Sequence, residues 1–146
     1  MARPASLSAA ALLGLPVRLQ GIKLGRPVDV LVDPEGWRVL GFVVEPRGGA
    51  LRFLPYAASQ PSRAEIAVGS ALMLLDDVGF YRKRSVSLRA LLGAAVERDG
   101  APVGTLVDLV VQADGEVSDL DLDGSGTVAR VPAGGSSVAP SEATAA

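Results

Sequence analysis

Residues 6–17, SLSAAALLGLPV, return later in the chain as residues 85–96, SVSLRALLGAAV. The correspondence continues beyond these two segments at a constant offset of 79 positions. It pairs Gly21 with Gly100, Gly25 with Gly104, Val28 with Val107, Asp29 with Asp108, Val32 with Val111 and Gly36 with Gly115. An internal repeat of this kind predicts two copies of one structural unit, and the fold has to be assigned with that repeat in view.

Each copy predicts a short helix followed by antiparallel strands. In the first copy Ser8 is placed to cap a helix that ends at Gly14, and the second copy repeats both residues. Residues 22–32 carry apolar side chains with the period of two that a half-buried strand requires. The sequence DPEG at 33–36 predicts a type I turn into a further strand at 37–44. We expect the following side chains to be largely buried: Val17, Leu24, Val28, Val30, Val32, Val43, Leu72 and Leu74.

Turns recur every few residues, which predicts an all-β fold. Residues 6–84 are expected to form a small antiparallel β-barrel, closed by strands at 65–68 and 71–75. Residues 85–133 end before any counterpart of those two strands, so the second barrel is expected to be truncated. An open barrel exposes sheet edges, so this half is expected to pack on the first barrel or to pair with another chain. Residues 134–146 are rich in Gly, Ser, Ala and Pro and are predicted to be a disordered tail.

The recurring residues also carry a resemblance to a known family. They are Leu13, Gly14, Val17, Gly21, Leu24, Gly25, the run VDVLVD at 28–33, and Gly36. In this pattern the chain resembles the PRC-barrel domain, which is named for the H subunit of the photosynthetic reaction centre and also forms the C-terminal part of a bacterial ribosome-maturation factor. The resemblance covers residues 6–75 well and 85–132 partly, because the second copy has Gln112 where the first has Asp33. It implies a small β-barrel that acts as an adaptor for other proteins, with no catalytic residues to carry over.

Composition excludes several classes of function. The net charge of the 146-residue chain is −2, which disfavours a dedicated nucleic-acid-binding protein. Cysteine and histidine are both absent, so disulfides, thiol chemistry, Cys or His metal sites and a Ser-His-Asp triad are excluded. No apolar run approaches the roughly 20 residues that span a bilayer. We therefore expect a cytoplasmic protein without a membrane span, and the preference for Arg over Lys is typical of GC-rich bacterial genomes.

Three motifs that could carry chemistry are better interpreted as structural. Asp119 to Gly124 begins like a calcium loop, but Arg130 stands where the closing Glu would be needed, which favours a strand with its carboxylates in solvent. The paired glycines of each copy lack the Lys and hydroxyl of a phosphate-binding loop, so they are interpreted as hairpin glycines. Asp29 and Asp108 occupy one repeat position and are expected to accept backbone N–H bonds or pair with an Arg, and not to act as an acid–base pair.

The candidate partner-binding residues are Trp37, Phe80, Tyr81, Arg82, Lys83 and Arg84. The last five join the two copies. Aromatic side chains beside a basic run can stack on nucleic-acid bases, and they are also enriched at protein interfaces. The alternative is a linker whose aromatic side chains pack between the copies while the basic groups stay solvated. Trp37, which is the only Trp, either closes a barrel end or anchors a partner.

These observations favour a non-catalytic protein–protein interaction adaptor or scaffold of the PRC-barrel type, with no cofactor. Its expected partner is another protein, or a second copy of this chain bound through the incomplete second repeat. Two alternatives from other classes remain. One is an RNA-processing or ribosome-assembly accessory protein, suggested by the family and the basic run. The other is a small-ligand-binding barrel, which would need an internal cavity with convergent polar groups.

Overall fold

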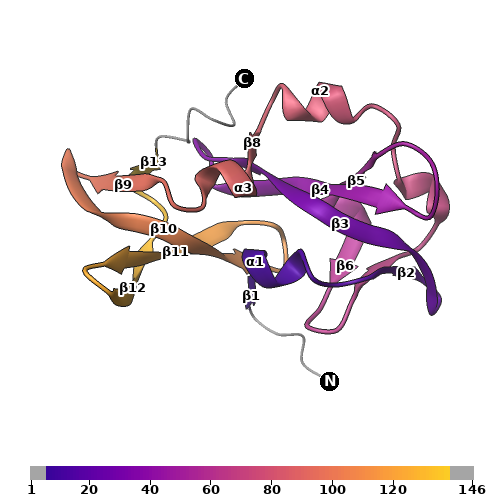
Figure 1. Cartoon of the computed structure of the whole chain (residues 1–146), viewed down its shortest axis with the longest axis horizontal. Coiled ribbons are helices and arrows are strands. Elements are labelled where there is room, and N and C mark those ends of the chain that lie inside the picture. Colours follow the sequence, from indigo (N-terminus) through magenta and orange to yellow (C-terminus); the bar gives the residue numbers. More distant parts are fainter. Residues whose placement is uncertain (1–5, 139–146) are drawn as a thin grey trace.

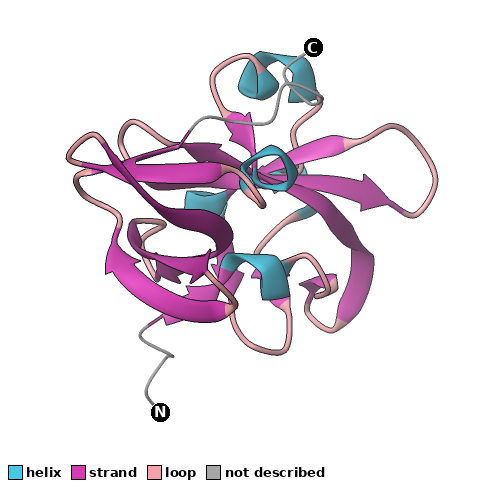
Figure 2. Cartoon of the chain, turned by 60° about the vertical axis from the view of Figure 1, so that its left-hand side comes forward, coloured by secondary structure: helices cyan, strands magenta, loops and turns pink. Residues whose placement is uncertain are grey.

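The computed structural model describes residues 6–138 and confirms an all-β fold made of two curled sheets (Figure 1). Sheet 1 contains β2 (Val17–Leu19), β3 (Ile22–Asp33), β4 (Arg38–Pro46), β5 (Arg52–Pro55), β6 (Ser59–Pro61), β7 (Ile66–Val68) and β8 (Val86–Ser87). Sheet 2 contains β1 (Ser6–Ser8), β9 (Ala95–Arg98), β10 (Ala101–Gln112), β11 (Val117–Gly124), β12 (Thr127–Pro132) and β13 (Ser136–Val138). The helices are α1 (Ala9–Leu12), α2 (Val78–Arg82), α3 (Leu88–Leu91) and the 3₁₀ turns η1 (Tyr56–Ala58) and η2 (Ala71–Met73), all of them short connections between strands (Figure 2).

The sequence repeat is also a repeat of backbone geometry. The strand order is β5-β4-β3-β2-β7-β6 in sheet 1 and β12-β11-β10-β9-β13 in sheet 2. The long strand β3 changes register with β4 between Pro27 and Asp29, and β10 changes register with β11 between Leu106 and Asp108. These bulges occupy the same repeat positions. Since a bulge bends a strand and increases its twist, both sheets curl at the same point.

The two halves exchange their first strands. β1 pairs with β10 of the second half, and β8 pairs with β3 of the first half. One side-chain contact accompanies each exchange, because the Ser8 hydroxyl donates to Asp108 and the Ser87 hydroxyl donates to Asp29. Both serines also cap the helices that follow them, α1 and α3. The observed contact therefore agrees with a structural role for both aspartates.

A third contact joins the halves where β4 and β11 begin. Arg38 forms an antiparallel bridge with Glu116. On either side of it, Val39 N donates to Gly115 O and Val117 N donates to Trp37 O, both at 2.8 Å. Each of these hydrogen bonds is the counterpart of the other with the roles of the two halves reversed. The halves are therefore related by an approximate two-fold axis through this bridge.

The turn that precedes this contact differs in length between the two halves, which changes one of the residue pairs expected from the repeat. Val32 pairs with Val39 in sheet 1, whereas Val111 pairs with Val117 in sheet 2, so the second turn is one residue shorter. Gly115 therefore corresponds to Trp37, and not to Gly36 as the constant offset predicts. Both residues have a positive φ, +50° at Trp37 and +94° at Gly115.

One hydrophobic core lies between the sheets and draws side chains from both halves. Buried residues of the first half include Phe42 and Leu54, and those of the second half include Leu106 and Leu109. A smaller cluster covers the outer face of sheet 1, where Leu31, Val43 and Phe53 are buried beneath α2 and the residues before it. The second half thus packs on the first, with exchanged strands and a common core.

Several expectations about individual segments need correction. Val17, Val30, Val32 and Val43 are buried, while Leu24, Val28 and Leu74 are half-buried. Leu72 is 86% exposed, because residues 71–73 form η2 and not a strand. The Ser70 hydroxyl accepts a hydrogen bond from Leu72 N and so caps that turn.

The segment expected to be a disordered tail differs at its beginning. Residues 136–138 form β13, which pairs with β9 and occupies the sheet edge left open by the missing closing strands. Arg98 supports this segment, because its Nη1 donates to Pro132 O at 2.6 Å and to Gly134 O at 3.1 Å. Edge pairing and these bonds outweigh the local composition. The remainder of the predicted tail, residues 139–146, lies outside the described residues. Among the described residues, none of the helices has the length and apolar character needed to cross a membrane.

Candidate functional site

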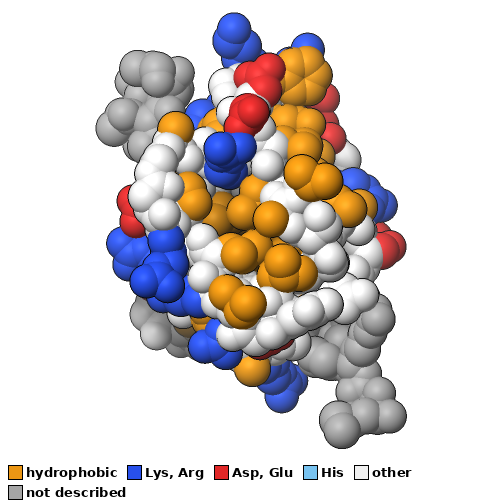
Figure 3. Space-filling view, turned by 90° about the vertical axis from the view of Figure 1, so that its right-hand side faces the viewer, with side chains coloured by type: hydrophobic (Ala, Val, Ile, Leu, Met, Phe, Trp, Pro, Cys, Tyr) orange, Lys and Arg blue, Asp and Glu red, His pale blue; other side chains and the backbone are white. Residues whose placement is uncertain are grey.

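Three exposed apolar side chains lie near one end of sheet 1, Ile22 at the start of β3 and Leu72 and Met73 in η2. Leu72 is 86% exposed, Ile22 is 65% exposed and Met73 is 41% exposed. Seen from this end, the molecule carries apolar side chains across the middle of the surface, with Lys and Arg side chains around them (Figure 3). We call Ile22, Leu72 and Met73 the apolar end. Exposed apolar groups gathered in this way are typical of interaction sites.

A hollow of about 400 Å³ adjoins the apolar end. Its walls come from the start of β3, the end of β4 and η2, and they are formed by Lys23, Leu24, Pro46, Arg47, Gly48, Arg52, Ala71 and Leu74. Arg52 forms an ion pair with Asp76, and nearby Arg26 lies 3.5 Å from Glu45. Among the described residues, Lys23 and Arg47 form no such pair. The hollow is therefore an apolar depression with two available positive charges at its rim.

The basic segment at 80–84 is largely occupied by contacts within the chain. The Tyr81 ring stacks on Phe53 with centroids 3.9 Å apart and planes 13° apart. The Arg84 guanidinium lies 3.6 Å from the centre of the Phe80 ring, and its Nη1 donates to Phe80 O at 2.9 Å. Arg82 approaches Asp29 at 3.9 Å, and Lys83 is exposed. Residues 80–82 therefore complete α2, which covers sheet 1, with Phe80 44% exposed at its surface.

Trp37 is placed in the common core and not at the surface. Its side chain is 6% exposed, and its indole Nε1 donates to Ser136 O at 3.1 Å. The ring thus links the turn between β3 and β4 to β13 of the other half. Of the two roles that the sequence left open, its burial supports closure of the barrel end, because a residue that contacts a partner must be accessible.

The alternating aspartates of β11 form no metal centre among the described residues. Asp121 accepts two hydrogen bonds from Arg130, 2.8 Å from Nε and 3.2 Å from Nη2. Asp119 accepts one from the Ser118 hydroxyl at 2.9 Å. Arg130, which stands where a calcium loop would have its closing Glu, thus pairs with Asp121, one of the residues that would have bound the ion.

Sequence reasoning missed the apolar end. It treated the apolar run at residues 71–75 as a strand and therefore assigned Leu72 to the core. The signal that could have found it is Gly69-Ser70, a turn dipeptide whose hydroxyl can cap a 3₁₀ turn. No protein-family model matches this chain, and no curated protein matches it. The function therefore has to be argued from the surfaces themselves.

Proposed function

We propose that this protein is a non-catalytic protein–protein interaction adaptor of the PRC-barrel type, and that it binds its partner through the apolar end. The observation that carries the proposal is Leu72, a large aliphatic side chain that is 86% exposed on a turn beside a hollow of about 400 Å³. Leaving such side chains in water costs free energy that a partner's surface would recover, at about 25 cal/mol per Å².

The charges at this surface indicate the chemistry of the partner. Lys23 and Arg47 stand at the rim of the hollow without a carboxylate partner among the described residues, so a partner with acidic groups around an apolar residue would complement it. The basic segment at 80–84 gives the RNA-accessory alternative less support, because four of its five side chains make contacts within the chain.

The experiment is affinity capture of the tagged full chain from a lysate of its own source, with and without RNase, read by mass spectrometry. The test variant is Leu72→Ser with Met73→Ser, and the matched control is Val128→Ser, which changes a 60% exposed valine on β12. We expect one discrete protein to be captured by the wild type and by the control, to survive RNase and to be lost from the test variant.

Other outcomes would contradict the proposal in different ways. Equal capture by the test variant would exclude the apolar end as the docking surface. Ribosomal proteins that disappear on RNase treatment would favour the RNA-accessory alternative. Empty captures would favour self-association or a small ligand, and the mass of the protein in solution would distinguish these two.

A further inference from the structure

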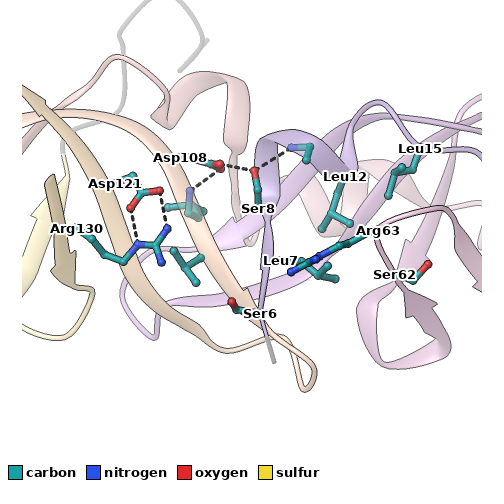
Figure 4. A pocket seen from close by; sticks show the side chains of 13 residues that line it. Ser6, Leu7, Ser8, Leu12, Leu15, Ser62, Arg63, Asp108, Asp121 and Arg130 are labelled. Carbon is teal, nitrogen blue, oxygen red and sulfur yellow. Dashed lines mark hydrogen bonds and ion pairs between the residues drawn. The ribbon is translucent and has the colours of Figure 1, made fainter. Parts of the chain in front are cut away.

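A second hollow lies on the outer face of sheet 2, beside β1 and α1, with a volume of about 320 Å³ (Figure 4). Its floor and one wall are apolar, formed by Leu7, Leu12, Leu15 and Val110 among others. Its polar groups come from Asp108, Asp121 and Arg130 on three neighbouring strands, and from Arg63 across the opening. We call it the sheet 2 pocket. It is at a different place from the apolar end, so it stands or falls independently of the proposed function.

The corresponding place on sheet 1 is filled by the chain itself. There the register aligns Asp29 with Val43, and Val43 with Phe53, across β3, β4 and β5. The Tyr81 ring stacks on Phe53, and Arg82 lies 3.9 Å from Asp29. An aromatic residue followed by an arginine therefore covers this row of three residues, with the ring over the edge strand and the base beside the aspartate.

Sheet 2 has a row of three residues at the corresponding register positions, and the described part of the chain places no such cover over it. The register aligns Asp108 with Asp121, and Asp121 with Arg130, and the bulge before Asp108 matches the bulge before its counterpart in sheet 1. Among the described residues, no aromatic ring lies over Arg130. Val107 next to this row is 38% exposed, whereas its repeat partner Val28 packs in the cluster beneath α2.

The chain's own sequence does not supply the missing ring. At the repeat offset, the positions that correspond to Tyr81 and Arg82 are Ala2 and Arg3. The six aromatic residues of the chain all lie among residues 6–138, and none of them lines this pocket. An aromatic ring bound in the pocket would therefore come from another molecule.

The side chains of the pocket are suited to such an occupant. Two hydrogen bonds to Asp121 fix the plane of the Arg130 guanidinium, and a fixed guanidinium is a stacking surface for an aromatic ring. The hydrogen bond and charge of Asp121 raise the pKa of Arg130, so it stays charged at any pH of interest. Asp108 accepts hydrogen bonds from the Ser8 hydroxyl, Ala10 N and Leu109 N but forms no ion pair among the described residues, so its negative charge attracts a second cation, while Arg63 across the opening repels one. The charges therefore orient the occupant with its base at Asp108.

We propose that the sheet 2 pocket binds a segment of a partner protein in which an aromatic residue is followed by a basic one, with the ring stacked on Arg130 and the base beside Asp108. The segment would repeat, between two molecules, the contact that Tyr81 and Arg82 make within the chain.

The test uses a synthetic peptide of residues 76–85, DDVGFYRKRS, with blocked ends, titrated into the ¹⁵N-labelled full chain. The site on sheet 1 is already filled by the tethered α2, whose high effective concentration excludes the free peptide. We expect saturable amide shifts at Leu109, Val110 and Asp121, the residues of the sheet 2 pocket. A peptide with Tyr81→Ala should bind about tenfold more weakly, and one with Arg82→Ala about fivefold more weakly.

Two protein variants complete the test. Arg130→Lys keeps the charge but removes the planar group, so peptide binding should weaken about fivefold, while Arg47→Lys, at the other end of the molecule, should leave it unchanged. Each variant is first shown to be folded by its amide spectrum. No saturable shift at millimolar peptide, shifts centred on Val43 and Phe53, or equal binding of the Tyr81→Ala peptide would each overturn the proposal.

Discussion

Replacement of Trp37 by alanine should destabilise the whole molecule, because this side chain belongs to the common core of both halves. Burial of a side chain of this size removes about 200 Å² from water, which corresponds to about 5 kcal/mol as an upper figure. The hydrogen bond from Nε1 to Ser136 O adds about 1 kcal/mol. The positive φ of +50° is kept in the variant, so no backbone strain is relieved. We expect Trp37→Ala to lower the free energy of unfolding by about 4 kcal/mol.

The assay is urea denaturation followed by far-ultraviolet circular dichroism, since the variant has no tryptophan fluorescence. Trp37→Phe should cost about 1–2 kcal/mol, because it keeps most of the packing and leaves the Ser136 carbonyl without its donor. Leu72→Ala is the control and should change stability by less than about 0.5 kcal/mol, because Leu72 is 86% exposed. A loss below about 1 kcal/mol for Trp37→Ala, with a two-state transition, would refute the assignment of Trp37 to the common core.

Three further predictions concern the turn, the cooperativity and Tyr56. Gly115→Ala should lower the free energy of unfolding more than Gly21→Ala. Both glycines have a positive φ, but only at Gly115 would a Cβ lie 3.1 Å from the Tyr56 ring. Equal losses of unfolding free energy in urea denaturation would contradict this close approach. Thermal unfolding should be a single transition that near- and far-ultraviolet circular dichroism report alike, because the halves exchange strands and have one core; two separated transitions would mean that the halves unfold independently. Burial, and then the charge of Asp114, raises the pKa of Tyr56 to about 12, while the same group ionises near 10 in the unfolded chain. Its contribution to stability is therefore complete below pH 10 and lost between pH 10 and 12, and an absorbance titration at 295 nm that finds both tyrosines ionised below pH 10.5 in the folded protein would be incompatible with this environment.

Several features could be predicted from the sequence alone. The all-β class, the long strand at residues 22–32 and the capping serines were predicted, and the structure has them. These features depend on local signals, namely side-chain alternation, turn residues and capping hydroxyls, which act over a few residues and are therefore legible in the sequence. The resemblance to the PRC-barrel family and the adaptor function stay predictions.

The features that decide the candidate sites depended on tertiary structure. The exchange of β1 and β8 joins strands about 100 residues apart in one case, and alternation does not specify which strand a segment will pair with. The position of Trp37 in the core also depends on residues distant in the sequence, because its indole Nε1 donates to Ser136 O near the far end of the chain.

Exposure was the other property that only the fold could decide. The apolar run at residues 71–75 predicts a strand, but residues 71–73 form a 3₁₀ turn that leaves Leu72 outside the core. Likewise, Asp29 and Asp108 occupy the same position of the sequence repeat. Asp29 lies beneath α2, whereas Asp108 lines an open pocket. The sequence determined what each segment can form, because backbone preferences are local. Only tertiary packing determined which segments cover each surface and which surfaces stay exposed, because contacts between distant segments depend on the shape of the whole chain.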